Sequence, residues 1–153
     1  MKSRIIRTGF GKRKEGRSGA AAVEMALVLP IFMMVVMGII EFGRAMMVSQ
    51  LITNAARYGV RLAIVDGSTN AAVTTAIQTF LTQTTSVAAT NVTVTITVTP
   101  AAGNPSASNL VENALPKDLC AVSISVPFSK VALTAGTYLK TTNLRGACTM
   151  PHE

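Results

Sequence analysis

The feature that most constrains this chain is a long apolar run close to its amino end. Residues 20–40 contain one charged side chain, Glu24. As an α-helix, this run would rise about 31 Å, which matches the hydrocarbon core of a bilayer. Its Val, Leu, Ile and Phe residues each favour insertion by about 0.3 to 0.6 kcal/mol, which together offsets one carboxylate near a helix end. The run predicts a transmembrane helix, because too little chain remains to bury it as a core helix.

The basic character of the chain is concentrated ahead of this run. The net charge is +7, and the first 19 residues carry seven basic side chains against Glu15, giving 7 − 1 = +6. These basic residues are Lys2, Arg4, Arg7, Lys12, Arg13, Lys14 and Arg17. The positive-inside bias places this head in the cytoplasm and the chain after Glu41 on the exported side. Phe10 is the only aromatic residue in the head, so we expect no nucleic-acid partner.

The apolar run does not have the pattern of an ordinary secretory signal. Such a signal has a shorter apolar region followed by a small-x-small cleavage site, whereas this run contains Glu24 and Pro30 and continues into IIEFGRAMM. A cut between Gly19 and Ala20 would instead remove the basic head and leave the helix in place. Glu24 would then be the fifth residue of the mature chain.

This arrangement resembles the type IV prepilin signal, in which a basic leader ends in glycine and a glutamate follows five residues beyond the cut. The longer segment AVEMALVLPIFMMVVMGIIEFGRAMMVSQLITNAARYGVRLAI resembles the TadE-like family of the tight-adherence pilus system. That family's pattern combines an AVE-ALVLP opening, a GIIEFGRA segment and a small-residue helix ending near NAAR-G-R-A. The resemblance covers residues 19 to about 65, and the region after Asp66 shows no specific match.

The resemblance implies a pseudopilin-like structural subunit of the bacterial inner membrane, processed by a prepilin peptidase after Gly19. Its expected partners are the membrane, the peptidase, other pilin or pseudopilin subunits and the pilus assembly machinery. The alternative is an unprocessed single-pass membrane protein whose exported domain binds a ligand or partner at the cell surface. Gly19 and Glu24 distinguish the two readings, because the alternative leaves their spacing unexplained.

Four residues of the helix are candidate assembly residues. After cleavage, Glu24 would complement the amine of Ala20 and the free N–H groups of the first turn. The resemblance implies that Glu24 also faces the amine of a neighbouring subunit, whereas a carboxyl kept neutral or reaching the interface remains an alternative. Pro30 removes a backbone donor and predicts a bend between Ala26 and Pro30. The resemblance makes this bend functional in packing or extraction; an ordinary membrane proline is equally open.

Glu41 and Arg44 stand three residues apart where the helix should leave the membrane. This spacing predicts an exposed ion pair on one helix face, which contributes about 0 to 1 kcal/mol and marks the outer interface. The resemblance implies a contact role for both.

The helix is predicted to continue to about residue 65 with two distinct faces. Its polar arc contains Gln50, Asn54, Arg57 and Arg61, and its small apolar arc contains Val48, Ile52, Ala55, Gly59 and Ala63. The two arginines are either a solvated face or an anion site.

The rest of the chain predicts a small α+β domain. After a stop at residues 66–68, apolar residues at helical spacing predict a second amphipathic helix over about 70–85. The run NVTVTITVT, a second run over 120–126 and a shorter one near 144–150 predict an antiparallel sheet packed on the small-residue arc. The predicted organisation is a leader over 1–19, a transmembrane helix over 20–40, its extension over 41–65 and an exported α+β domain over 66–153, a pilin-like arrangement.

Cys120 and Cys148 are the only cysteines, and both follow the predicted span. An even count in an oxidising compartment predicts one disulfide, which would be worth about 3 to 4 kcal/mol for a loop of this length. No nucleophile, metalloprotease or phosphate-loop motif is present, and His152 is the only histidine. We therefore expect no enzyme, no cofactor and no metal site.

Overall fold

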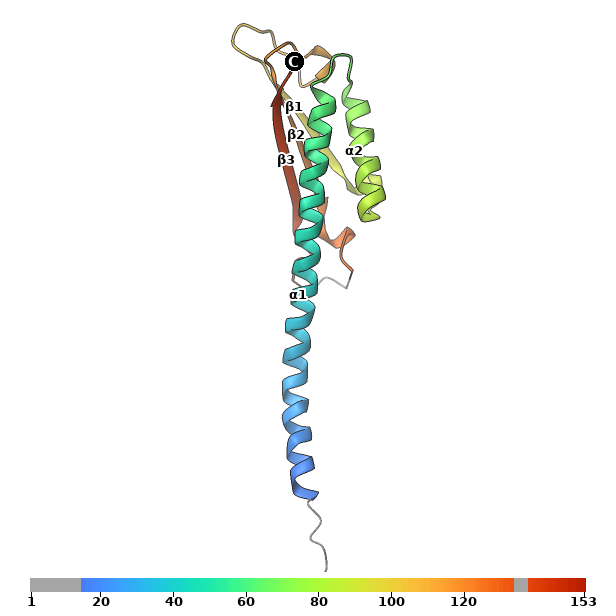
Figure 1. Cartoon of the computed structure of the whole chain (residues 1–153), viewed down its shortest axis with the longest axis vertical. Coiled ribbons are helices and arrows are strands. Elements are labelled where there is room, and N and C mark those ends of the chain that lie inside the picture. The colour runs from blue at the N-terminus through green and yellow to red at the C-terminus, as the bar shows by residue number, and fades with distance from the viewer. Residues whose placement is uncertain (1–14, 134–137) are drawn as a thin grey trace, which may run out of the picture. The chain divides into compact units, whose positions relative to one another are not determined.

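The computed structural model describes residues 15–133 and 138–153, with side chains from Gly19 onward. The first part of the predicted leader, residues 1–14, lies outside the described residues. The elements are α1 (Glu15–Ala63), α2 (Asn70–Thr85), β1 (Thr93–Thr99), β2 (Leu119–Pro127) and β3 (Asn143–Pro151), with short 3-10 turns between them (Figure 1). The chain divides into two compact units, residues 1–37 and 38–153, and the second has the predicted α+β fold.

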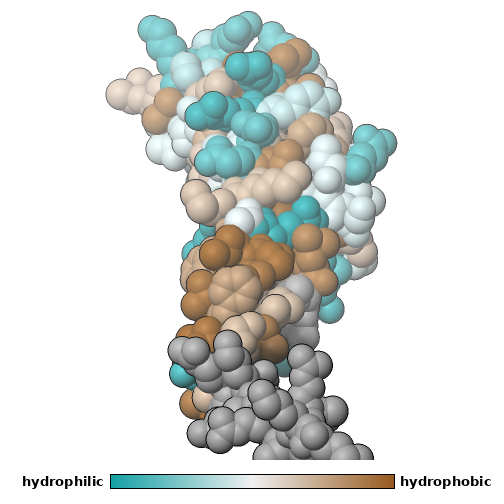
Figure 2. Space-filling model, turned by 60° about the horizontal axis from the view of Figure 1, so that its bottom comes forward, coloured by the Kyte–Doolittle hydropathy of each residue, from teal (hydrophilic) through white to brown (hydrophobic). Residues whose placement is uncertain are grey.

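The apolar part of α1 is exposed along its length. The helix includes Pro30 without a break and forms one candidate membrane span between Gly19 and Ala63, by length and composition. Large apolar side chains are exposed at many positions from Val23 to Met47. Figure 2 shows that strongly hydrophobic residues gather in one zone of the surface. Hydrophilic and weakly polar residues prevail in a second zone. A membrane would cover the hydrophobic zone.

The second half of α1 is the central helix of the domain. The predicted small apolar arc is buried, and the predicted polar arc is exposed, as the two-faced pattern requires. α2 and this half of α1 lie side by side over one face of the sheet (Figure 1). The helix ends at Ala63, and Gly67 supplies a positive φ of 80° in the turn that follows.

The second helix has the bounds that its periodicity predicts, Asn70–Thr85. The Thr69 side chain accepts a hydrogen bond from the Ala72 N–H and caps the first turn. Ser86 follows in the left-handed conformation and donates its N–H to the Thr82 carbonyl. The buried stripe of α2 faces the core and repeats every four residues. It consists of Val73, Ile77, Leu81 and Thr85.

The three predicted strands form one antiparallel sheet in the order β1-β2-β3. In the register, Ile96 pairs with Val122, and Val122 pairs with Cys148. Val122 is buried and the other two are partly buried, whereas the alternating threonines of β1 are exposed on the opposite face. The strict alternation of the sequence therefore places one apolar face on the helices and one polar face in solvent.

Two glycines set how closely α1 approaches its neighbours. A Cβ at Gly59 would collide with the Ile77 side chain of α2. A Cβ at Gly146 on β3 would lie 2.9 Å from the Thr53 nitrogen and 3.1 Å from the Ile52 carbonyl carbon of α1. The second contact is with backbone, which cannot move aside as a flexible side chain can. Gly146 therefore allows strand and helix backbones to touch.

We predict that Gly146→Ala destabilises the domain by about 1 to 3 kcal/mol, the usual cost of overpacking a core. Gly43→Ala is the matched control, because it lies on exposed α1 with nothing within 4 Å of an added Cβ. That substitution should be neutral or stabilising by about 0.5 to 1 kcal/mol, since alanine favours helix. Denaturant unfolding in detergent, followed by circular dichroism, measures both; equal stability of Gly146→Ala and the unaltered protein would contradict the packing described.

Candidate functional site

The predicted processing and assembly residues lie on the exposed apolar part of α1. The Gly19–Ala20 peptide bond is inside the helix, and both residues are exposed. A Cβ added at Gly19 would meet nothing within 4 Å. Glu24 and Pro30 follow on the same exposed segment. Within the described residues, the Glu24 carboxylate has no hydrogen bond or ion pair.

Glu41 is buried, although the sequence predicted an exposed charge at this position. Its side chain is only 3% exposed. The carboxylate accepts the Tyr138 N–H at 3.0 Å and 3.2 Å and the Leu139 N–H at 2.6 Å. A buried carboxylate is costly unless donors replace the lost water, and here two backbone N–H groups do so. Glu41 therefore fixes a segment almost a hundred residues away in the sequence.

Arg44 binds the same region from the next turn of α1. Its Nε donates to the Val131 carbonyl at 3.1 Å, and its Nη1 lies 3.8 Å from the Met47 sulfur. Both side chains therefore make contacts within the chain, and their assembly role stays a prediction. Both side chains hold the connection between β2 and β3, whose described parts are residues 128–133 and 138–142. The prediction that this pair is exposed was wrong for Glu41, because Glu41 is buried beneath the connection.

The two arginines further along α1, Arg57 and Arg61, are exposed. This position on the outer face of the domain agrees with the solvated-face alternative.

Asp118 organises the loop between β1 and β2, a role that the sequence did not indicate. The residue is completely buried. Its Oδ1 accepts the Ala101 N–H at 2.8 Å and the Asn104 side-chain amide at 2.6 Å, and its Oδ2 accepts the Leu115 N–H at 2.9 Å. These hydrogen bonds hold the pKa of Asp118 below its ordinary value, with the Ala101 bond as the largest cause. A lone aspartate in turn sequence gives no signal of such a network.

The two cysteines are free thiols in the structure, so the predicted disulfide is not confirmed. They lie on adjacent strands but are not opposite each other, because Cys120 pairs with Met150 and Cys148 pairs with Val122. Diagonal neighbours of this kind are about 7 to 8 Å apart, whereas a disulfide needs Cα atoms within about 6.8 Å. Burial raises the pKa of the Cys120 thiol. The bond therefore stays a prediction, and this register does not favour it.

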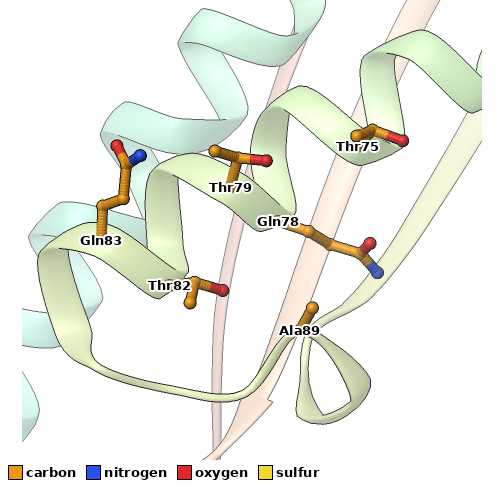
Figure 3. A pocket seen from close by; sticks show the side chains of 6 residues that line it. All are labelled: Thr75, Gln78, Thr79, Thr82, Gln83 and Ala89. Atoms are coloured by element: carbon orange, nitrogen blue, oxygen red, sulfur yellow. The ribbon is translucent and has the colours of Figure 1, made fainter.

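One surface depression on α2 offers little chemistry. It is shallow and open, and its lining carries only hydroxyl, amide and methyl groups (Figure 3). The lining residues are Thr75, Gln78, Thr79, Thr82, Gln83 and Ala89. Gln78 also donates to the Val92 carbonyl at 3.4 Å. Over the described residues, no group of three or more His, Cys, Asp or Glu side chains could hold a metal ion.

These features define a class of protein: a small α+β domain built on one long helix whose apolar half is a candidate membrane span. The comparisons with known proteins narrow this class. Residues 19–61 match the model of the TadE-like protein family, which confirms the resemblance predicted from the sequence. The match indicates a protein associated with a tight-adherence pilus system. No curated protein and no solved structure shows a significant match to this chain.

The matched segment contains every predicted processing and assembly residue. Gly19, Ala20, Glu24 and Pro30 lie in its apolar part, and Glu41 and Arg44 lie at the start of the domain helix. The α2 helix and the sheet lie beyond the match, so their description depends on the structure alone.

We predict that acid weakens the domain through Asp118. Because the folded state lowers the pKa of this carboxyl, its contribution to stability is present above the ordinary aspartate pKa of about 3.9 and is lost as the pH falls through the lower folded value. The unfolding midpoint should therefore fall on acidification below that range.

The matched variant is Asp118→Asn. Its amide would direct a donor at the N–H of Ala101 or Leu115, so the variant should be less stable at neutral pH and lose part of the acid dependence. Thermal unfolding of both proteins between neutral and strongly acidic pH measures this. An unchanged acid dependence in Asp118→Asn would contradict the role assigned to Asp118.

Proposed function

We propose that this chain is a pseudopilin-like structural subunit for assembly of a tight-adherence pilus. A prepilin peptidase cleaves it after Gly19, so that the mature chain begins at Ala20 and carries Glu24 as its fifth residue. The observation that carries the proposal is the position of Gly19 and Glu24 at the head of the TadE-like match, on an exposed apolar helix.

The distribution of charge along the chain supports the removal of the leader. The first 19 residues contribute +6 of the net charge of +7, leaving 7 − 6 = +1 on the other 134 residues. Before cleavage, this basic head holds the amino end in the cytoplasm, with the domain on the periplasmic or extracellular side. After cleavage, the charged groups on residues 20–40 are the new amine of Ala20 and the carboxylate of Glu24.

Glu24 then acts in the packing of one subunit against another. A charged carboxylate in hydrocarbon costs about 2.5 to 3.5 kcal/mol at a helix centre, so an ionised Glu24 favours any arrangement that supplies a cation. The amine created at Ala20 of a neighbouring subunit is such a cation. A buried pair of this kind specifies register more than it stabilises, because desolvation offsets much of the attraction.

The exported domain serves in this proposal as a rigid body carried by the assembly helix. α1 enters the domain core directly, so movement or rotation of the helix beyond Gly38 moves the sheet with it. The surface depression on α2 is lined by hydroxyl, amide and methyl groups, and none of its six lining side chains is charged.

The first test is Glu24→Gln, expressed in cells that contain the prepilin peptidase and the pilus machinery. A charge-assisted hydrogen bond contributes about 1.5 to 3 kcal/mol, so loss of the carboxylate should reduce co-assembly by roughly tenfold or more. The measurements are the intact mass of the membrane form and the amount of pilin-like subunits cross-linked to it.

Glu112→Gln is the control, because it removes one carboxylate from an exposed position outside the TadE-like match. It should leave both measurements unchanged. If Glu24→Gln also left processing and co-assembly unchanged, the assembly role of Glu24 would be wrong, and a permanent single-pass anchor would become the better reading.

A further inference from the structure

The connection between β2 and β3 has two described arms, residues 128–133 and 138–142. Both arms are hydrogen-bonded to α1. On the first arm, the Val131 carbonyl accepts from Arg44, and the Val131 and Ala132 N–H groups donate to the Phe128 carbonyl. On the second arm, the Tyr138 and Leu139 N–H groups donate to Glu41. At the base, Phe128 donates its N–H to the Thr142 carbonyl, and its side chain is fully buried. The height of the connection along α1 is therefore fixed by two residues of the helix.

These two residues place the connection beside the outer edge of the predicted span. At the α-helical rise, Glu41 lies about 1.5 Å beyond Ile40 and Arg44 about 6 Å beyond it. The headgroup layer on each side of a bilayer is about 5 to 7.5 Å thick, from the difference between the hydrocarbon core and the whole membrane. Gly38 contacts the same arm, since a Cβ there would lie 3.7 Å from the Tyr138 ring. Both arms therefore reach the headgroup layer.

The side chains at the ends of the arms have the chemistry of a membrane interface. Leu133 is 72% exposed, and Tyr138 is 47% exposed, although the domain has a core that could cover apolar groups. Lys130 and Lys140 flank them and are also exposed. Tyrosine is enriched at the membrane–water boundary, and long lysine side chains near the end of a span extend their ammonium groups into the interface. At the same height, Phe42 and Met46 of α1 are exposed on one helix face.

We infer that these four residues, Lys130, Leu133, Tyr138 and Lys140, form a membrane foot that rests in the outer headgroup layer. Leu133 and Tyr138 enter the interface, and the lysines bind the phosphates of anionic lipids. The buried carboxylate of Glu41 holds the foot at this depth. The inference rests on the membrane anchoring in the proposed function, but not on cleavage after Gly19.

The chain contains no tryptophan and two tyrosines, which allows a direct test of depth. The full chain is reconstituted into vesicles of phosphatidylglycerol and phosphatidylcholine brominated near the headgroup or deep in the acyl chain, which quench nearby tryptophan. Tyr138→Trp should be quenched severalfold more than Tyr58→Trp, most strongly by the shallow bromines. Tyr58 is the matched control, because it is 46% exposed on the domain part of α1, beside Phe80. Leu133→Trp provides a second reporter on the other arm.

Phe32→Trp reports on the span itself and should be quenched most by the deep bromines. If that variant is quenched while Tyr138→Trp and Leu133→Trp match Tyr58→Trp, the foot is wrong and the membrane anchoring stands. Equal strong quenching at Tyr58 and Tyr138 would also overturn the foot, because the whole domain would then lie on the lipid. If Phe32→Trp is not quenched, both the foot and the anchoring in the proposed function fail.

Discussion

The domain depends on the close packing of α1 against the sheet and α2. Small residues on one arc of the helix make this packing possible. Gly59 leaves room for the Ile77 side chain, and Gly146 lets the backbone of β3 approach the backbone of α1. The same helix, α1, contains both the candidate membrane span and the central helix of the domain. An element that is long, apolar and fixed in its own domain suits a subunit that assembles through its helix.

Most of the fold follows from local patterns in the sequence. The small-residue arc of α1, the bounds of α2 and the alternation of β1 and β2 are periodic features, and burial in the structure follows them. Periodicity identifies a face because helices and strands repeat at fixed intervals. It reports nothing about which distant residue meets that face. The order of the strands and the contacts of the loops therefore had to come from the structure.

The roles of Glu41, Asp118 and the cysteines show this limit. Glu41 looked like half of a surface ion pair, because Arg44 is its nearest opposite charge in the sequence; its actual partners include N–H groups at Tyr138 and Leu139. Asp118 has no signal in the sequence, yet its buried carboxylate accepts three hydrogen bonds in the connection between β1 and β2. The even cysteine count suggested a bond, but the strand register sets the two residues diagonally. Backbone partners and register have no signature in composition or spacing.

The central claim is that this chain is processed as a prepilin before it takes part in pilus assembly. The most direct measurement is the amino-terminal residue of the protein recovered from membranes, by sequencing or intact mass. The account predicts a start at Ala20. That result would establish the cut after Gly19 and make Glu24 the fifth residue of the mature chain. An intact Met1 end, in cells with an active prepilin peptidase, would contradict the account, and so would a start well beyond Ile40.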